Sequence, residues 1–314
     1  MTEPLRPMST GQVLDQTFAL YRKNFWLFVG IATVGPAANV IFQLLTVGAN
    51  IGTPFSPGRP VANPSNLAVF GLSMLFGYII LLVGMAISHA ATVKAVAAVY
   101  LGLRISIVGA YKALRGRILS LFGTGILILL IMAAALLAVT LLMIPVVFVI
   151  GLFGKASAGV GAAIVGAVAV FLIVIGVFAA MIMVYARYAL AIQACIVEAL
   201  GPVASLKRSS FLTKGSRWRA IAIYGVFLLL SMVLGGGLGA VAGAIGVLVH
   251  NKIVAAVLVY LAGFIAGSVT GPLATIGLSL LYYDERVRKE AFDLQLMLSS
   301  LDAPPAAMAF PAQV

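Results

Sequence analysis

The side chains that could do chemistry in this chain are few, and they form no catalytic or metal-binding pattern. Cys195 is the one cysteine, and no nearby histidine could activate its thiol. His89 and His250 are expected at opposite ends of membrane segments, where each would contact the interface rather than share a metal ion. The chain has no Gly-x-Ser-x-Gly, His-Glu-x-x-His, Cys-x-x-Cys or phosphate-binding loop motif. We therefore expect no enzymatic activity, no metal ion and no cofactor.

The acidic residues beside the apolar segments are expected to form structural ion pairs. Glu198 has Arg187 and the basic residues beyond position 200 as candidate partners, and an ion pair is favoured over acid–base catalysis. Asp284 and Glu285 are expected at a helix end that faces the cytoplasm beside Arg286 and Arg288, with partners of the i,i+4 type.

Basic residues far outnumber acidic ones, and their placement indicates contact with a membrane surface. The chain has 20 Lys and Arg against 8 Asp and Glu, a net charge of +12 at pH 7. These cations lie in clusters between long uncharged stretches, which argues against a nucleic-acid partner. We expect them to set the topology and to contact anionic lipid headgroups, with a specific polyanion site as the alternative. The candidate headgroup contacts are Arg22, Lys23, Lys112, Arg115, Arg117, Lys207, Arg208, Lys214, Arg217 and Arg219.

Polar groups also occur within the uncharged stretches. Asn39 and Gln43 are four residues apart and share a helical face, and buried amides in lipid need partners on a neighbouring helix. Ser268 and Thr270 lie close to Pro272, which can bend a helix. The two amides and two hydroxyls form a candidate intramembrane polar site, since transporters bind substrates at broken helices near the midplane. No ionisable residue lies in the middle of a stretch, which argues against ion-coupled transport.

Six glycines recur at every fourth residue in the last two uncharged stretches. Glycine on one helical face lets another backbone approach closely, so these two helices are expected to form a tight hairpin. A substrate path between them is the alternative. The six glycines are Gly235, Gly239, Gly243, Gly263, Gly267 and Gly271.

All these residues must be positioned by six stretches that contain no charged side chain. A hydrocarbon layer about 30 Å thick needs roughly 20 apolar helical residues, so each stretch is long enough for one spanning helix. Strands are excluded because the stretches are long and lack period-two alternation. The sequence predicts an all-α polytopic membrane helix bundle with six transmembrane helices. The stretches are 24–58, 60–93, 118–154, 156–186, 220–251 and 253–283.

The uneven distribution of cations predicts the orientation of the chain. Of the 20 Lys and Arg residues, 17 lie before the first stretch, after the last, or in the second and fourth gaps. The other three gaps carry one cation each, Arg59, Lys155 and Lys252. Cytoplasmic loops carry the excess of Lys and Arg, so both termini are expected in the cytoplasm. The N-terminal residues do not resemble a cleaved signal peptide, so the first stretch is expected to be retained.

A polar, helix-prone segment precedes each pair of stretches, which predicts three repeats of one unit. The segments begin at Thr10, Ser106 and Gly201, with spacings of 96 and 95 residues. Each unit would be an interfacial amphipathic helix followed by a hairpin of two spanning helices. The approximate repeats are 10–105, 106–200 and 201–300, within a single integral membrane domain 1–300.

The three polar segments are expected to begin with recognisable helix starts. Ser9 would head a capping box, Ser106 would be an N-cap, and Pro202 suits a first helical turn. The helices would lie in the headgroup plane or pack against the mouth of the bundle, and both alternatives stay open. Their apolar faces are Leu14, Phe18, Tyr21 and Phe25, then Ile107, Tyr111, Leu114 and Ile118, then Val203 and Leu206.

Two proline-containing regions are predicted to lack regular structure. The outer loop 49–66 contains four prolines and is expected to be an irregular connector, with a binding role as the alternative. The tail 301–314 is expected to be disordered.

Three polar passages make the chain resemble a known family. They are Arg6-Pro7-Met8-Ser9-Thr10-Gly11-Gln12, Ile196-Val197-Glu198-Ala199-Leu200-Gly201-Pro202 and Tyr282-Tyr283-Asp284-Glu285-Arg286. The chain resembles a bacterial polytopic membrane family named after the glycerophosphoryl diester phosphodiesterase membrane domain. That resemblance implies six membrane helices and a bacterial inner-membrane location. It supplies no catalytic residue, because the hydrolase is a separate barrel domain for which this chain has no room.

The sequence therefore predicts a non-enzymatic integral membrane protein of the bacterial inner (plasma) membrane. Its expected role is that of a scaffold or accessory component that organises lipid or a membrane-protein partner at the cytoplasmic face. The alternative is a transporter or translocator of a lipid or small molecule, based on the proline-interrupted stretches and the amides within them.

The predicted orientation can be tested by cysteine labelling. In a Cys195→Ser background, Lys112→Cys and Lys207→Cys should react with a membrane-impermeant maleimide only after the cytoplasmic side is opened, because both lie in cation-rich gaps. Labelling of either position in intact cells would refute the orientation.

Overall fold

The computed structural model describes residues 7–50, 64–155 and 160–291, and within those ranges every regular element is a helix. Six helices are long and apolar enough to cross a membrane. The prediction of an all-α, multi-pass membrane protein is therefore confirmed. The tail 301–314 and most of the loop 49–66 lie outside the described residues.

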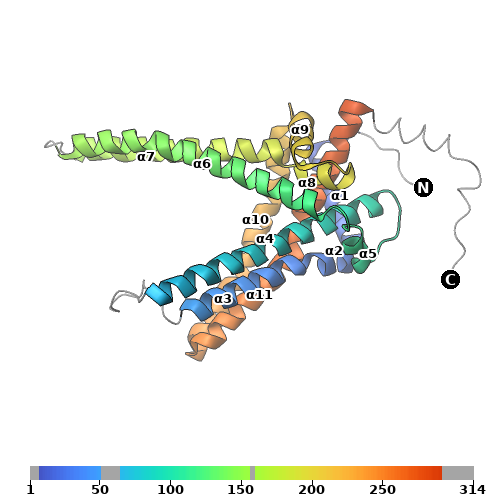
Figure 1. Cartoon of the computed structure of the whole chain (residues 1–314), viewed down its shortest axis with the longest axis horizontal. Helices are drawn as coiled ribbons and strands as arrows, with labels where there is room; N and C mark the ends of the chain where they lie inside the picture. The colour runs from blue at the N-terminus through green and yellow to red at the C-terminus, as the bar shows by residue number, and fades with distance from the viewer. Residues whose placement is uncertain (1–6, 51–63, 156–159, 292–314) are drawn as a thin grey trace, which may run out of the picture.

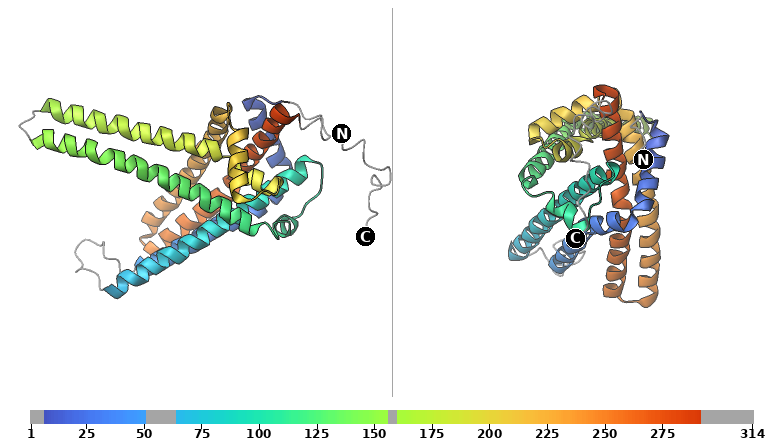
Figure 2. Two further views of the ribbon diagram at one scale, coloured as in Figure 1. Left: turned by 45° about the horizontal axis from the view of Figure 1, so that its top comes forward. Right: turned by 90° about the vertical axis from the view of Figure 1, so that its right-hand side faces the viewer.

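The long helices pair into three hairpins that diverge from a common base (Figures 1 and 2). The hairpins are α3 (Val34–Asn50) with α4 (Pro64–Tyr100), α6 (Ile118–Lys155) with α7 (Val160–Tyr188), and α10 (Arg217–Val249) with α11 (Lys252–Glu290). The α6–α7 hairpin stands apart from the other two, and only 6% of the most apolar window of each of its helices is buried. In water such a surface would be unstable, whereas lipid chains solvate it.

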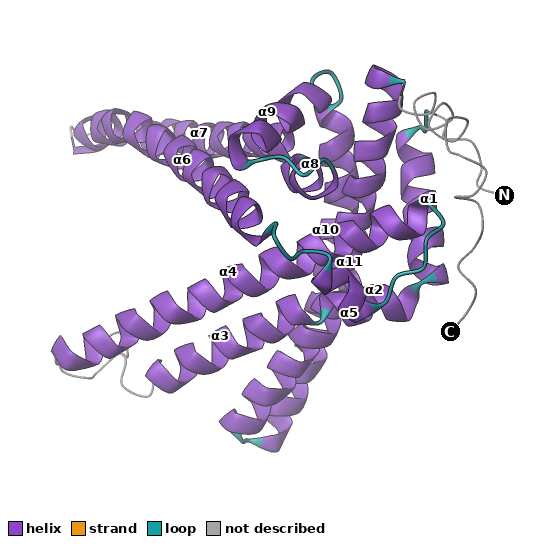
Figure 3. Ribbon diagram, turned by 45° about the vertical axis from the view of Figure 1, so that its right-hand side comes forward, coloured by secondary structure: helices purple, strands orange, loops and turns teal. Residues whose placement is uncertain are grey.

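Five shorter helices gather where the hairpins meet, and together with the adjoining ends of the long helices they form what we call the base (Figure 3). They are α1 (Thr10–Lys23), α2 (Phe25–Ala32), α5 (Ile107–Lys112), α8 (Ala191–Val197) and α9 (Pro202–Leu212). Most of the fully buried large side chains lie here, Phe28, Ile196, Leu212 and Tyr282 among them. The hydrophobic core is therefore at the base, and the outer parts of the spans are left to the lipid.

The predicted helix starts are confirmed. Ser9 and Gln12 form a capping box at α1, in which the Ser9 hydroxyl accepts from the Gln12 N–H at 3.3 Å and the Ser9 N–H donates to Gln12 Oε1 at 2.7 Å. Ser106 caps α5 by accepting from the Gly109 N–H at 3.0 Å. Pro202 occupies the first turn of α9. Each satisfies or removes a backbone donor that a helix start leaves unpaired.

The buried face of α1 differs from the predicted one. Val13, Thr17 and Tyr21 are buried where α1 packs on α11 and α10, whereas Phe18 is 43% exposed. Phe25 begins a separate helix, because α1 ends before Asn24 and α2 starts after it. These contacts fit a first polar helix that packs against the bundle, the second of the two alternatives, better than one that lies free in the headgroup plane.

The first span is broken at Thr33, between α2 and α3. Pro36 has no N–H to offer the carbonyl of Ala32, four residues earlier, and the Ser88 hydroxyl lies 3.4 Å from that oxygen. The last span carries Pro272 inside α11, and the Tyr21 hydroxyl donates to the Val269 carbonyl one turn earlier at 2.6 Å. Side chains of neighbouring helices thus bond to carbonyls beside both prolines, as the lipid interior requires.

The helices α10 and α11 pack along each other, but the predicted glycines are mostly not the reason. A methyl group added at Gly239, Gly243, Gly263 or Gly271 would meet no atom within 4 Å. At Gly235 it would lie 3.7 Å from Ala266, and at Gly267 it would face Pro36 of α3 rather than α10. The closest approach is at Gly246, where an added methyl would lie 2.7 Å from the Ala255 Cα. Glycines at every fourth residue share one helical face, but their spacing does not indicate which neighbouring helix that face contacts.

Substitution of two glycines in α10 should show whether a glycine stabilises the hairpin only where it contacts α11. Gly246→Ala should destabilise the hairpin by about 1–3 kcal/mol, because the methyl would overlap the backbone of α11. Gly239→Ala, in the same helix with open space around it, is the matched control. Thermal unfolding in detergent measures both, and equal melting temperatures would contradict the proposed contact.

Candidate functional site

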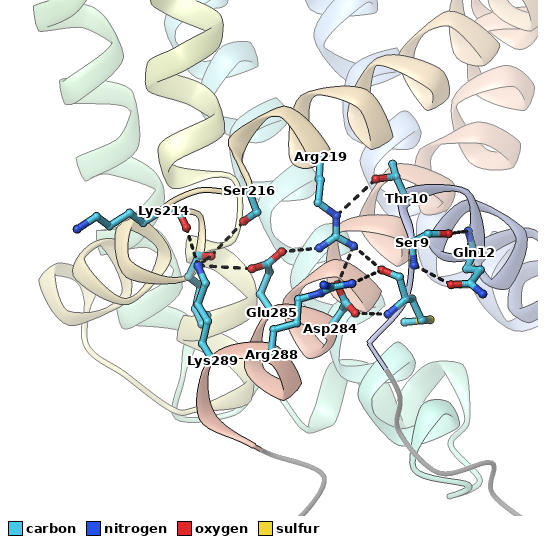
Figure 4. A network of polar contacts seen from close by, with 12 residues as sticks. Ser9, Thr10, Gln12, Lys214, Ser216, Arg219, Asp284, Glu285, Arg288 and Lys289 are labelled. Carbon is cyan, nitrogen blue, oxygen red and sulfur yellow. Dashed lines mark hydrogen bonds and ion pairs between the residues drawn. The ribbon is translucent and has the colours of Figure 1, made fainter.

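Polar groups concentrate in two places, an ion-pair network in the base and a cavity between the first and third hairpins. The network is centred on Arg219, in the first turn of α10, and on Asp284 and Glu285 near the end of α11 (Figure 4). Arg219 lies 2.7 Å from Asp284 Oδ2 and 2.7 Å from Glu285 Oε1. The two carboxylate side chains are 0% and 2% exposed, so the guanidinium replaces the water they have lost.

The same network holds the N-terminal segment. The Met8 N–H donates to Asp284 Oδ1 at 2.6 Å, and the Met8 carbonyl accepts from Arg219 at 2.8 Å and from Arg288 at 2.6 Å. Lys289 donates to the Lys214 carbonyl at 2.8 Å. The chain before α1, the turn after α9 and the end of α11 are therefore joined through one set of charges.

A second group of ion pairs ties α9 to α11. Arg208 lies 2.8 Å from Glu198 and binds both carboxylate oxygens of Glu290. The Tyr282 hydroxyl also donates to Glu198. The hydrogen bond to Glu290 raises the pKa of Arg208 above its usual value. The predicted pairing of Glu198 with a basic residue beyond position 200 is confirmed.

The network corrects two predictions. Arg208 and Arg219 were expected at lipid headgroups, but their charges are used inside the protein. Asp284 and Glu285 were expected to face the cytoplasm, but both residues are buried, with 1% of each whole residue exposed. Pairs of the predicted i,i+4 type are present, Asp284 with Arg288 at 2.9 Å and Glu285 with Lys289 at 3.5 Å, whereas Arg286 lies 3.3 Å from Glu290. Sequence spacing finds partners on the same helix and cannot find Arg219 on another.

Most of the remaining candidate headgroup cations lie on the surface of the base. None of the six exposed ones forms an ion pair with another described residue. Arg117 instead donates to the Ala199 carbonyl at 2.6 Å, and Arg217 is half-buried, with its Nε buried and without a hydrogen-bond partner among the described residues. The six exposed cations are Arg22, Lys23, Lys112, Arg115, Lys207 and Lys214.

Both tryptophans lie beside these cations and were missed as functional candidates. Trp26 is 80% exposed in the first turn of α2, and Trp218 is 70% exposed in the first turn of α10. Tryptophan favours the boundary between headgroups and hydrocarbon, where its ring is apolar and its N–H stays hydrated. The signal in the sequence was a tryptophan within three residues of a basic residue at the start of a span.

Two tyrosines of the base bond to backbone carbonyls of two different spans, Tyr111 to the first and Tyr21 to the last. The Tyr111 hydroxyl donates to the Ile31 carbonyl at 2.5 Å, and Tyr21 bonds to Val269 of α11. Burial raises the pKa of Tyr21 and of Tyr111 to about 12. Both phenols therefore stay protonated, and remain donors, at neutral pH.

A cavity of about 300 Å³ lies between the first and third hairpins, with walls from α3, α4, α10 and α11. Of the four predicted intramembrane polar residues, Asn39 and Thr270 line it, whereas Gln43 and Ser268 do not. The Ser268 hydroxyl is buried without a hydrogen-bond partner among the described residues. The predicted polar site is thus only half assembled.

His89 belongs to this cavity, which corrects its predicted interface position. Its Nδ1 lies 2.7 Å from the Thr275 hydroxyl, and both residues line the cavity. Sequence position placed His89 near the inner end of a span ending at residue 93, but α4 continues to Tyr100. The histidine therefore lies about three turns inside the helix.

Other reactive residues remain isolated. Within residues 7–50, 64–155 and 160–291, no group of three or more His, Cys, Asp or Glu is placed to hold a metal ion. Cys195 is buried in α8, away from solvent.

Loss of the central guanidinium should destabilise the base strongly. Arg219→Ala should lower the free energy of unfolding by about 3–5 kcal/mol, because two buried carboxylates lose their counter-charge. Arg22→Ala, at an exposed position, should change it by less than about 0.5 kcal/mol. Denaturant unfolding in detergent compares the two, and similar losses would show that the network is not a structural centre.

Comparison of the chain with protein-family models, with curated proteins and with solved structures finds no match. The resemblance to the glycerophosphoryl diester phosphodiesterase membrane-domain family and the threefold repeat accordingly stay predictions. The six long apolar helices establish the class of the molecule, a multi-pass integral membrane protein.

Proposed function

We propose that this protein is a non-enzymatic scaffold or accessory component of the bacterial inner membrane. It would organise lipid or a membrane-protein partner at the cytoplasmic face, with both termini in the cytoplasm. The observation that carries the proposal is the separation of charge in the base. Four of the acids, Glu198, Asp284, Glu285 and Glu290, are paired within it, whereas six cations stand exposed on its surface.

This separation gives the base a basic outer surface at the depth of the headgroups. Each well-placed cation near an anionic bilayer contributes about 1 kcal/mol of attraction. Trp26 and Trp218 would fix that depth, since both are exposed and both begin membrane helices. The ion pairs among α9, α10 and α11 would keep the surface rigid.

The diverging hairpins support an organising role. Large apolar side chains remain exposed along α6 and α7, including Leu137 at 60% and Phe178 at 66%. Lipid chains or the apolar helices of a partner would cover them. An arrangement of three hairpins is also what three repeats of one unit, as predicted from the sequence spacing, would produce.

A lipid or small-molecule translocator is the second candidate, and the cavity favours it. The cavity lies between spans that contain Pro36 and Pro272, and its lining includes Asn39 and Thr270. Broken helices around a polar cavity are typical of transporters. Faster transbilayer movement of a fluorescent, uncharged glycolipid in proteoliposomes would favour this candidate over the scaffold.

The proposed lipid contact can be tested by native co-purification. A variant with Lys112→Gln, Arg115→Gln, Lys207→Gln and Lys214→Gln should retain several-fold less anionic lipid when extracted from bacterial membranes with a mild detergent. The reason is the loss of four exposed cations that have no partner among the described residues. Mass spectrometry of bound lipids and proteins gives the measurement.

The matched control keeps the charge at the same positions, with Lys112→Arg, Arg115→Lys, Lys207→Arg and Lys214→Arg. It should retain lipid as the parent protein does. Unchanged retention in the neutral variant would refute the basic surface as a lipid site. Enrichment of one lipid class without any protein partner would count against a protein scaffold.

A further inference from the structure

We infer that the cavity between the first and third hairpins binds the uncharged, hydroxyl-bearing end of a neutral glycerolipid, which reaches it sideways from the bilayer. This goes beyond the proposed function and does not rest on it, because the cavity and the basic surface involve different residues.

The lining of the cavity fits an uncharged polar group. No Asp, Glu, Lys or Arg lies among its lining residues, so an ionised headgroup would lose its hydration without gaining a counter-charge. The lining does offer an amide, an imidazole and several hydroxyls. These polar residues are Asn39, Ser88, His89, Thr92, Tyr224, Ser231, Thr270 and Thr275.

Most of these groups can accept hydrogen bonds from a ligand. The hydroxyls of Thr92, Ser231 and Thr270 each donate to a carbonyl in their own helix, at 2.8–2.9 Å, which leaves their oxygens as acceptors. The Asn39 amide forms no hydrogen bond with another described residue. It can therefore both donate to and accept from a ligand hydroxyl, and it has no competing partner to lose.

The exposure of the lining shows how a ligand reaches the cavity. Thr270 and Thr275 are about 5% exposed or less and form its interior, whereas Met85 and Leu228 are 41% and 40% exposed and form its rim. The rim residues lie within the spanning segments of α4 and α10, so the opening faces lipid chains rather than water. A ligand must therefore be soluble in the bilayer.

The size of the cavity fits a headgroup and not a whole lipid. About 300 Å³ is at the lower end of the range of roughly 300–1,000 Å³ for ligand pockets. The glycerol end and the start of the chains would be enclosed, and the rest of each chain would pass between α4 and α10. The space exists because Gly263, Gly267 and Gly271 line it from α11 without side chains.

Photolabelling of the full-length protein tests this inference. The probe is a diacylglycerol carrying a diazirine near the carboxyl end of one chain, in phosphatidylcholine vesicles that contain the reconstituted protein. Peptides that span 85–92 and 263–275 should be labelled most strongly. Gly271→Leu should cut that labelling several-fold, because its side chain would extend into space that is now open.

The matched control is Gly239→Leu, which places the same side chain in open space on α10 away from the cavity and should leave labelling unchanged. Asn39→Leu removes the amide without breaking a bond to another described residue and should also reduce labelling, so the test does not depend on Gly271→Leu folding.

Three results would overturn the inference. One is labelling of the cavity peptides in Gly271→Leu and Asn39→Leu that is as strong as in the parent protein, when both variants also unfold at the parent's temperature. Another is equally strong labelling by a phosphatidic acid with the same diazirine chain, which would mean that charge is not excluded. The third is labelling spread evenly along α6 and α7, as for bulk lipid. None of them bears on anionic lipid retention by the basic surface, so the two proposals fail separately.

Discussion

Asp284 and Glu285 bring two negative charges into the protein interior, and the guanidinium of Arg219 makes their burial tolerable. Moving a carboxylate out of water without a counter-charge costs several kcal/mol of folding free energy. An ion pair and hydrogen bonds on several sides of the carboxylate offset that cost. Arg219 lies 2.7 Å from both acids and also bonds to the Met8 carbonyl. One side chain of α10 therefore bonds both to α11 and to the segment before α1, at the centre of the base.

This concentration of contacts explains why the hairpins can diverge. Helices in a membrane are not driven together by the hydrophobic effect, because lipid chains are as apolar as the side chains they touch. The α6–α7 hairpin accordingly keeps most of its apolar surface exposed, while the short helices of the base hold the core. The ion pairs and the buried core are concentrated in the base, and the exposed apolar surface lies along the hairpins.

The cavity is a consequence of the same arrangement. Two hairpins that leave the base at an angle cannot pack closely along their whole length, and the glycines of α11 widen the space between them. Prolines on both sides free backbone carbonyls, and Ser88 and Tyr21 bond to carbonyls beside them. Ser88, one of the polar lining residues, thus also bonds to a carbonyl beside Pro36.

Composition could not show which cations form ion pairs inside the base and which are exposed on its surface. Four of the cations at positions 207–219 show this, since two arginines are bound to acids and two lysines are exposed. They are Lys207, Arg208, Lys214 and Arg219. The same is true of the glycines, since Gly246 meets α11 closely and Gly239 meets nothing. In both cases residues of like charge or of the same type differ in the groups that the tertiary structure places opposite them.

The sequence alone determined the six membrane helices and the helix starts at Ser9, Ser106 and Pro202, because solvation by hydrocarbon and helix capping act over neighbouring residues. It also indicated that Glu198 pairs with a nearby cation, since Arg208 is close along the chain. Only the tertiary structure decided that Asp284 and Glu285 are buried against Arg219, that His89 meets Thr275, and that Asn39 and Thr270 line one cavity without Gln43. These contacts join helices far apart in the chain, and no local periodicity specifies which helical faces meet when hairpins pack at an angle.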